Sequence, residues 1–139
     1  MFKKILVPLD GSEHSRRALE AAIQIAQRFD GKLTLIHVYS IGGLASSPEP
    51  VYGFIQAIRK VGSKILEEEK KKVEEKDIQV DTLLVEGHIV DEIIKTCREG
   101  GFDLIVMGAR GLSRIKELVL GSVSEGVTRY ACCPVLIVK

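Results

Sequence analysis

The sequence has few aromatic residues, almost no net charge and no long apolar run, and these shortages limit what kind of protein it can be. It has no tryptophan and only 5% aromatic residues among its 139 positions, so aromatic partners that could stack on a ligand are scarce. Twenty basic residues against nineteen acidic ones leave a net charge of +1, which is no electrostatic footprint for nucleic acid or an anionic membrane. No apolar run approaches the roughly 18–20 residues of a membrane-spanning helix.

Cysteine is also scarce, and its pattern is unlike that of a secreted protein. There are three cysteines, an odd number, and Cys132 and Cys133 are adjacent, so they cannot be the disulfide framework of a small secreted fold. Cys97 falls on the apolar stripe of an expected helix, where it is favoured as a small buried hydrophobe. No CxxC motif is present, so a metal or redox site on the vicinal pair is not favoured. The chain starts without the features of a signal peptide. We therefore expect a cytoplasmic protein with no nucleic-acid or membrane partner.

Two kinds of segment alternate along the chain. Short runs rich in Val, Ile and Leu predict five strands: Lys4–Leu9, Lys32–Val38, Gln79–Val85, Asp103–Met107 and Val135–Val138. Stretches with helical spacing of apolar residues separate them. Strand–helix alternation of this kind predicts an α/β fold: one domain, residues 1–139, with an open parallel sheet, right-handed crossovers and helices on both faces.

The four expected helices carry start and stop signals. Ser12 is a plausible N-cap for the first, whose apolar stripe ends before Gly31. The second has an apolar stripe from Ile55 through Val61 to Val73, after a loop expected over residues 40–50. The third stops at Gly100-Gly101, and the fourth opens near Ser122 and runs towards Ala131.

A glycine-rich run follows the fourth expected strand. Gly108, Gly111 and Gly121 come at spacings that leave two and then nine residues between them, and Ser122 follows the last. Glycines let main-chain amides approach an anion, and the start of a helix adds its positive dipole end. Arg110 and Arg114 could add charge, so the run is typical of a phosphate cradle. An ordinary turn followed by a helix cap is the alternative. The spacing fits neither a Walker P-loop nor a dinucleotide GxGxxG fingerprint.

This run resembles the signature of the universal stress protein family in its ATP-binding branch, G-x2-G-x9-G-[S/T]. The resemblance covers the whole length, from "KKILVPLDGSEHSRRALE" through "LTLIHVY" to "CPVLIVK". It implies a Rossmann-like fold of the adenine nucleotide alpha-hydrolase type with strand order 3-2-1-4-5. It also implies ATP as ligand, with Mg²⁺ or Mn²⁺.

The resemblance also implies a set of nucleotide-binding residues. The end of the first strand lies beside the nucleotide, with Asp10 near the ribose and the metal-bound phosphates. Val38 meets adenine through its backbone, and the glycine run holds ribose and phosphates. The implied residues are Pro8, Leu9, Asp10, Val38, Met107, Gly108, Ala109, Arg110, Gly111, Leu112, Ser113, Arg114, Gly121, Ser122, Val123 and Ser124.

Several of these assignments have local alternatives. Asp10 is either a site residue or a residue that closes a turn before Gly11. Ser12 is favoured as a cap over a nucleophile. His14 and His88 could face the ligand, but exposed positions at the starts of helices are the favoured interpretation.

We therefore expect an ATP-dependent regulatory module of the stress response. A slow ATPase or an autophosphorylating enzyme is the alternative, which the lack of an evident residue to activate water disfavours. A response-regulator receiver fits poorly, because Asp10 stands alone where clustered acids are needed. An ATP-pyrophosphatase would need an SGGxDS-type loop, and "LDGSEHS" is not one.

The apolar character of the last expected strand predicts that the protein associates with a second copy of itself. With the implied strand order, residues 134–139 form an outer strand with four consecutive apolar residues, an edge that invites pairing. Pairing with a second copy about a two-fold axis predicts a homodimer. No downstream protein partner is predicted.

Overall fold

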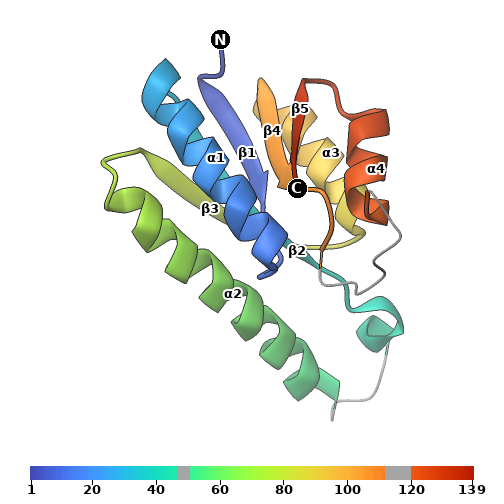
Figure 1. The fold of residues 1–139 in the computed structure, drawn as a ribbon. Helices are drawn as coiled ribbons and strands as arrows, with labels where there is room; N and C mark the ends of the chain where they lie inside the picture. Colours follow the sequence, from blue (N-terminus) through green and yellow to red (C-terminus); the bar gives the residue numbers. More distant parts are fainter. Residues whose placement is uncertain (47–50, 112–119) are drawn as a thin grey trace.

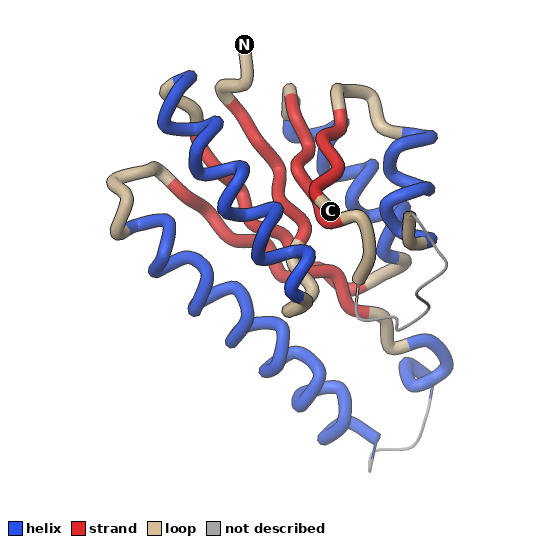
Figure 2. The backbone as a smooth tube through the Cα atoms, in the orientation of Figure 1, coloured by secondary structure: helices blue, strands red, loops and turns tan. Residues whose placement is uncertain are grey.

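The computed structural model describes residues 1–46, 51–111 and 120–139. Five parallel strands form one sheet in the order β3-β2-β1-β4-β5, which confirms the predicted topology. Figure 2 shows the strands as a central layer between helices. The strands are β1 (Lys4–Pro8), β2 (Lys32–Tyr39), β3 (Val80–Glu86), β4 (Leu104–Gly108) and β5 (Val135–Val138). Each bound lies within one residue of its predicted position.

Helices cover both faces of the sheet, as predicted (Figure 1). They are α1 (Glu13–Phe29), α2 (Tyr52–Glu74), α3 (Ile89–Gly100) and α4 (Ser122–Tyr130), with a short 3-10 helix, η1 (Gly42–Ser46). Among the helices in the described part of the chain, none is long and apolar enough to cross a membrane.

Alternate residues of the central strands build two cores. Ile5 and Val7 of β1 point to the face covered by α1 and α2, while Leu6 points to the face covered by α3 and α4. All three side chains are fully buried. A strand that is buried on both faces must be apolar at every position, which is why these runs show no alternation in the sequence.

The two ends of α1 confirm one local prediction and refine another. Ser12 is the N-cap, and its hydroxyl accepts a hydrogen bond from the Ser15 amide at 3.2 Å. At the other end the left-handed residue is Asp30, with φ of 55°, and not Gly31. Gly31 is needed for space instead, because a Cβ there would lie 2.5 Å from the Phe2 carbonyl oxygen.

The segment after β2 differs from the expected plain loop. Residues 42–46 form η1, and residues 47–50 lie outside the described residues. The expected apolar stripe of the second helix is also only partly buried, since Val61 is 60% exposed. Figure 1 shows the start of α2 extending past the end of the sheet, so its first turns have no strand beneath them.

The strand order positions the site. From β1 the chain moves outward through β2 to β3, and from β4 it moves the other way to β5. The direction therefore reverses between β1 and β4, and ligands of open parallel sheets bind at the carboxyl ends of the strands beside such a reversal. Both α1 and α4 begin at this edge.

Candidate functional site

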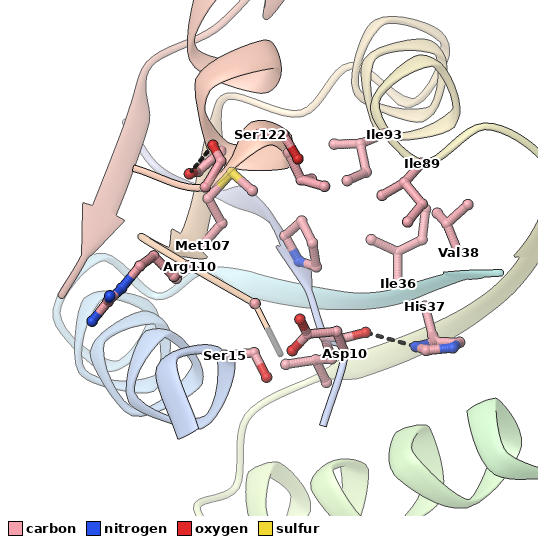
Figure 3. Close-up of a pocket in the computed structure, with 17 residues that line it drawn as sticks. Asp10, Ser15, Ile36, His37, Val38, Ile89, Ile93, Met107, Arg110 and Ser122 are labelled. Atoms are coloured by element: carbon pink, nitrogen blue, oxygen red, sulfur yellow. Dashed lines mark hydrogen bonds between the residues drawn. The ribbon is translucent and has the colours of Figure 1, made fainter. Parts of the chain in front are cut away.

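A pocket of about 400 Å³ lies at the carboxyl ends of β1, β2 and β4 (Figure 3). This volume falls within the roughly 300–1,000 Å³ of small-molecule sites. The pocket is lined by Pro8, Leu9, Asp10, Ser15, Ile36, His37, Val38, Ile89, Ile93, Met107, Gly108, Arg110, Gly111, Gly121, Ser122, Val123 and Ser124.

Most of the site residues expected from the sequence line this pocket. Ala109 does not, because it is buried behind the wall with 1% of its surface exposed. The expected residues Leu112, Ser113 and Arg114 lie outside the described residues. The other twelve all come together, although they are drawn from four separate segments of the chain.

An apolar wall from β2 and α3 was missed by sequence reasoning. Ile89 and Ile93 gather beside Ile36 and Val38 (Figure 3). The spacing of Ile89 and Ile93, four residues apart at the start of α3, was a signal that they share one helix face. It could not show that the face meets a pocket. Ser15 and His37 complete the missed lining residues.

The base of the glycine-rich loop is closed by a pair of hydrogen bonds. The Ala109 carbonyl oxygen accepts one from the Gly121 amide and one from the Ser124 hydroxyl, both at 2.7 Å. Ser124 is 2% exposed. Its hydroxyl therefore holds the two ends of the loop together, while Ser122 stands exposed in the first turn of α4.

Two of the signature glycines are required by close approach. A Cβ on Gly108 would lie 2.7 Å from the His14 Cβ and 2.8 Å from the His14 carbonyl carbon, so this glycine lets α1 pack against the end of β4. A Cβ on Gly111 would lie 2.5 Å from Asp10 Oδ2, inside the pocket. Gly108 thus serves packing, and Gly111 keeps space beside the carboxylate.

The first turn of α4 is open to the pocket. Its N-cap, Gly121, has no side chain, and no side-chain hydrogen bond caps the helix. The first amide groups of a helix have no acceptor within the helix, and the helix dipole adds partial positive charge there. Because Gly121, Ser122 and Val123 line the pocket, these amides have the geometry and partial charge that suit an anion.

Asp10 closes the turn before α1, one of the two roles that the sequence left open, and it also lines the pocket. Its Oδ1 accepts a hydrogen bond from the Ser12 amide at 2.9 Å, which closes the turn before α1. Its Oδ2 lies towards Gly111 on the pocket side. Within residues 1–46, 51–111 and 120–139, no group of three or more His, Cys, Asp or Glu side chains is arranged to hold a metal ion.

The histidines take three different positions. His88 is exposed at the N-cap of α3, outside the pocket lining, with Nδ1 3.4 Å from an Asp91 carboxylate oxygen. His14 packs against Gly108, and its buried Nδ1 has no hydrogen-bond partner in the described structure. His37 lines the pocket, with Nδ1 2.7 Å from the Leu9 carbonyl oxygen. The expected exposed position is thus found for His88, while His14 is half-buried.

A doubly wound parallel sheet with a pocket at its switch point defines a Rossmann-like α/β domain. The model of the universal stress protein family matches residues 1–139, and the chain belongs to this family.

Three relatives illustrate the similarity. Universal stress protein YxiE of Bacillus subtilis is 40% identical, and the match covers 100% of both chains. The solved structure of protein MJ0577 has a TM-score of 0.91 at 32% identity, with 100% of this chain and 96% of that one covered. A universal stress protein solved in complex with cAMP has a TM-score of 0.71 at 31% identity, covering 99% and 96%.

Proposed function

We propose that this universal stress protein binds ATP in the pocket and acts as a nucleotide-dependent regulatory module of the stress response. The observation that carries the proposal is the uncapped start of α4, which opens into a pocket that also has an apolar wall. The complex of a relative with cAMP supports an adenine nucleotide as ligand. From cysteine usage alone, we expect the protein to act in the cytoplasm.

The phosphate end of the ligand is assigned to α4. Main-chain amides at the start of a helix bind phosphate oxygens without needing a basic side chain. In Figure 3 the Arg110 side chain extends to the side away from Ile89 and Ile93, whereas Ser122 at the start of α4 is drawn on their side. We therefore assign phosphate binding chiefly to the main chain around Gly121, with the Ser122 hydroxyl as a further donor.

The adenine end is assigned to Val38 and the apolar wall. Peptide groups alternate in direction along a parallel strand, and the Ile36 carbonyl accepts a hydrogen bond from Leu9 at 2.8 Å. The main-chain groups of Val38 therefore face the same side as those of Ile36. The paired register of β1 with β2 ends at Pro8 and Ile36, so Val38 faces the space beyond the end of β1. A base edge can bond there while its faces contact isoleucine side chains.

Mg²⁺ fits the residues around Asp10. This ion takes oxygen ligands and usually reaches a protein through one or two carboxylates together with substrate phosphates. Asp10 Oδ2 offers one such oxygen beside the space that Gly111 leaves open. Bound there with ATP, the ion would neutralise phosphate charge, and Asp10 would hold and orient it.

Calorimetry with Mg²⁺-ATP tests the proposal. Wild-type protein should bind, and Gly111→Val should abolish binding while the fold stays intact, because the new side chain occupies the space between Asp10 and the loop. Gly53→Val is the matched control, since a Cβ at Gly53 meets nothing within 4 Å. Unchanged ATP affinity in folded Gly111→Val protein would contradict the proposal. Following ADP release in the same samples separates binding from slow hydrolysis.

We further propose that the protein is a homodimer through residues 134–139. β5 is the outer strand and pairs only with β4 in the described sheet. The carbonyls of Pro134 and Val138 accept hydrogen bonds from the Ile105 amide of β4 and the Ala109 amide just after it. Val135 and Ile137 therefore direct their main-chain groups to the free edge. Leu136 is 40% exposed beside this edge. An antiparallel second copy of β5 would cover it.

Main-chain groups of β5 point alternately to β4 and to the free edge, and this alternation gives a specific test of the dimer. Ile137→Pro removes an amide from the free edge and leaves the bonds to β4 in place, so it should shift the sedimentation of the protein towards monomer. Leu136→Pro is the contrast, because it breaks the pairing with β4 and should destabilise the fold. Sedimentation of wild-type protein as a monomer at tens of micromolar contradicts the proposed dimer.

A further inference from the structure

All three cysteines gather at one place, far from the pocket end of the sheet. Cys97 lies in the last turn of α3, and Cys132 and Cys133 lie in the turn between α4 and β5. The Sγ of Cys97 is 3.3 Å from the Sγ of Cys133 and 3.7 Å from that of Cys132. Segments about 35 residues apart in the chain thus bring three free thiols into van der Waals contact.

The three thiols differ in their access to solvent. Cys97 is fully buried, Cys133 is half-buried and Cys132 is exposed. Burial raises the pKa of both Cys97 and Cys133 above the usual range for a thiol, and the contacts of Cys97 with the other two sulfurs raise its pKa further. A dissolved oxidant can reach Cys132 directly, whereas Cys97 can be reached only by another sulfur of the cluster.

We propose that Cys97, Cys132 and Cys133 form a redox-responsive site at which hydrogen peroxide oxidises Cys132 and Cys97 then closes a disulfide with it. In the first step the Cys132 sulfur attacks a peroxide oxygen, the O–O bond breaks, and a sulfenic acid and one water form. In the second step the Cys97 sulfur attacks the Cys132 sulfur, the S–O bond breaks, and the hydroxyl leaves as water with the thiol proton. The two thiols together lose two electrons, which reduce the peroxide.

Cys133 extends the site to a second disulfide. Its sulfur is nearer to Cys97 than that of Cys132 is. It can therefore attack the Cys97 sulfur of the first disulfide, which transfers the bond to the Cys97–Cys133 pair and releases the Cys132 thiol. A dithiol reductant restores all three thiols. Reversible disulfides of this kind suit a reducing compartment, where stable structural disulfides are rare.

The disulfide would close a loop around the functional part of the chain. Residues 98–131 lie between the joined cysteines, and they include β4, the glycine-rich loop and α4. Cross-linking a loop of this length restricts the unfolded chain and stabilises the folded one. Oxidation would thus raise the free energy of unfolding of the domain. The thiol chemistry itself does not depend on the proposed nucleotide binding.

Peroxide treatment of the whole protein tests the proposal. Native wild-type protein is exposed to hydrogen peroxide, alkylated under denaturing conditions and mapped by mass spectrometry. We expect an intramolecular disulfide that contains Cys97, reversible by dithiothreitol. The melting temperature of the oxidised form should be higher by on the order of 5–10 °C. Cys132 overoxidised to sulfinic acid while Cys97 stays alkylatable would overturn the proposal.

Two variants separate the steps. Cys132→Ser changes an exposed residue and should slow loss of the Cys97 thiol by about tenfold or more, because the accessible entry point is gone. Equal rates in this variant and the wild type contradict the assignment of Cys132. Cys97→Ala should leave a sulfenic acid on Cys132 that dimedone traps, whereas the wild type should yield little dimedone adduct. Equal trapping in both proteins contradicts a role for Cys97.

Discussion

Of the helices that begin at the pocket, α1 and α4 have first turns that are built in opposite ways. Both α1 and α4 follow a strand end at the carboxyl edge of the sheet, and residues from both turns line the pocket. Every helix start has amides without acceptors in the helix, so both could in principle hold an anion. The local residues decide which one is available.

The start of α1 is closed by its own side chains. The Ser12 hydroxyl accepts from the Ser15 amide, and Asp10 accepts from the Ser12 amide. The Arg16 guanidinium donates to the Gly11 carbonyl oxygen at 2.9 Å. The carboxylate also brings negative charge to this end, which repels a phosphate. The start of α1 is therefore not available to an anion, and the residue just before it presents a carboxylate to the pocket.

The start of α4 has none of these groups. Gly121 supplies a cap without a side chain, and the Ser124 hydroxyl is turned back to Ala109 at the base of the loop. The comparison teaches that a helix start can bind an anion only where no side chain already occupies its amides or adds negative charge. The pocket thus has a carboxylate just before α1 and the partial positive charge of a helix start at α4.

The largest effect on stability is expected at Gly108, where α1 packs against the end of β4. Gly108→Ala would place a Cβ within 2.8 Å of the backbone of His14, so α1 or β4 must shift. We expect a loss of about 3 kcal/mol in the free energy of unfolding, measured with urea. Gly53→Ala, at a helical position with open space, should not be destabilising. A Gly108→Ala variant as stable as the wild type would show that the contact with His14 is not required.

Giving α4 the kind of cap that α1 has should move stability and affinity in opposite directions. In Gly121→Asp the carboxylate would cap the helix and raise the free energy of unfolding by a few tenths of a kcal/mol. The same charge should lower ATP affinity by at least about tenfold, because it occupies the amides and repels phosphate. The backbone of Gly121, with φ of −74°, accepts a side chain.

Calorimetry and thermal melting measure the two effects of this cap. Gly121→Asn separates blocked amides from repulsion, since it caps without charge and should lose less affinity than Gly121→Asp. If both variants bind ATP like the wild type, the phosphates do not lie at α4.

A smaller effect is expected when the carboxylate on the α1 side is neutralised. Asp10→Asn keeps an oxygen that can accept from the Ser12 amide, so the turn should hold. Coupling between two ligands is typically about 1–3 kcal/mol, and the Mg²⁺-dependent part of the ATP affinity should fall to under about 1 kcal/mol in the variant. Titrations with and without EDTA measure it. Equal responses of wild type and variant would make Asp10 a turn residue only.

The smallest effect on binding is expected from opening the cap of α1. Ser12→Ala removes the acceptor for the Ser15 amide and should cost about 1 kcal/mol in unfolding free energy. ATP affinity should change by less than about twofold. Ser12→Asn, which can still cap, should recover the stability. A loss of affinity as large as that of Gly121→Asp would give Ser12 a role in the site and erase the contrast between the helices.

Much of the architecture could be predicted from the sequence, because strands and helices have local signals such as apolar runs and capping residues. Apolar runs placed all five strands to within a residue at each end, and Ser12 marked the start of α1. The strand order came from family resemblance and is confirmed. The stripe of α2 was partly wrong at Val61, since periodicity reports an apolar face and not how far the sheet extends beneath it.

Pocket-lining residues could be predicted where they lie within or beside a sequence motif. They could not be predicted where their position depends on how a helix packs on the sheet. The family resemblance, carried by the glycine spacing, implied twelve described residues that do line the pocket. Ile89 and Ile93 were missed because their place in the wall depends on the angle at which α3 crosses the sheet. Cys97 was expected to be buried, and it is, but its contact with Cys133 depends on how α3 and α4 pack side by side.

The sequence by itself determined the alternation of strands and helices, the caps of α1 and the composition of the loop after β4. These depend on interactions within a few residues, whose strengths are set by side-chain type. Only the tertiary structure decided that Gly108 serves packing, that Gly111 faces Asp10, that Ser124 closes the loop and that three thiols meet. Each of these contacts joins segments that are distant in the chain or depends on the path of a loop, so it exists only once the crossovers have packed both helix layers onto the sheet.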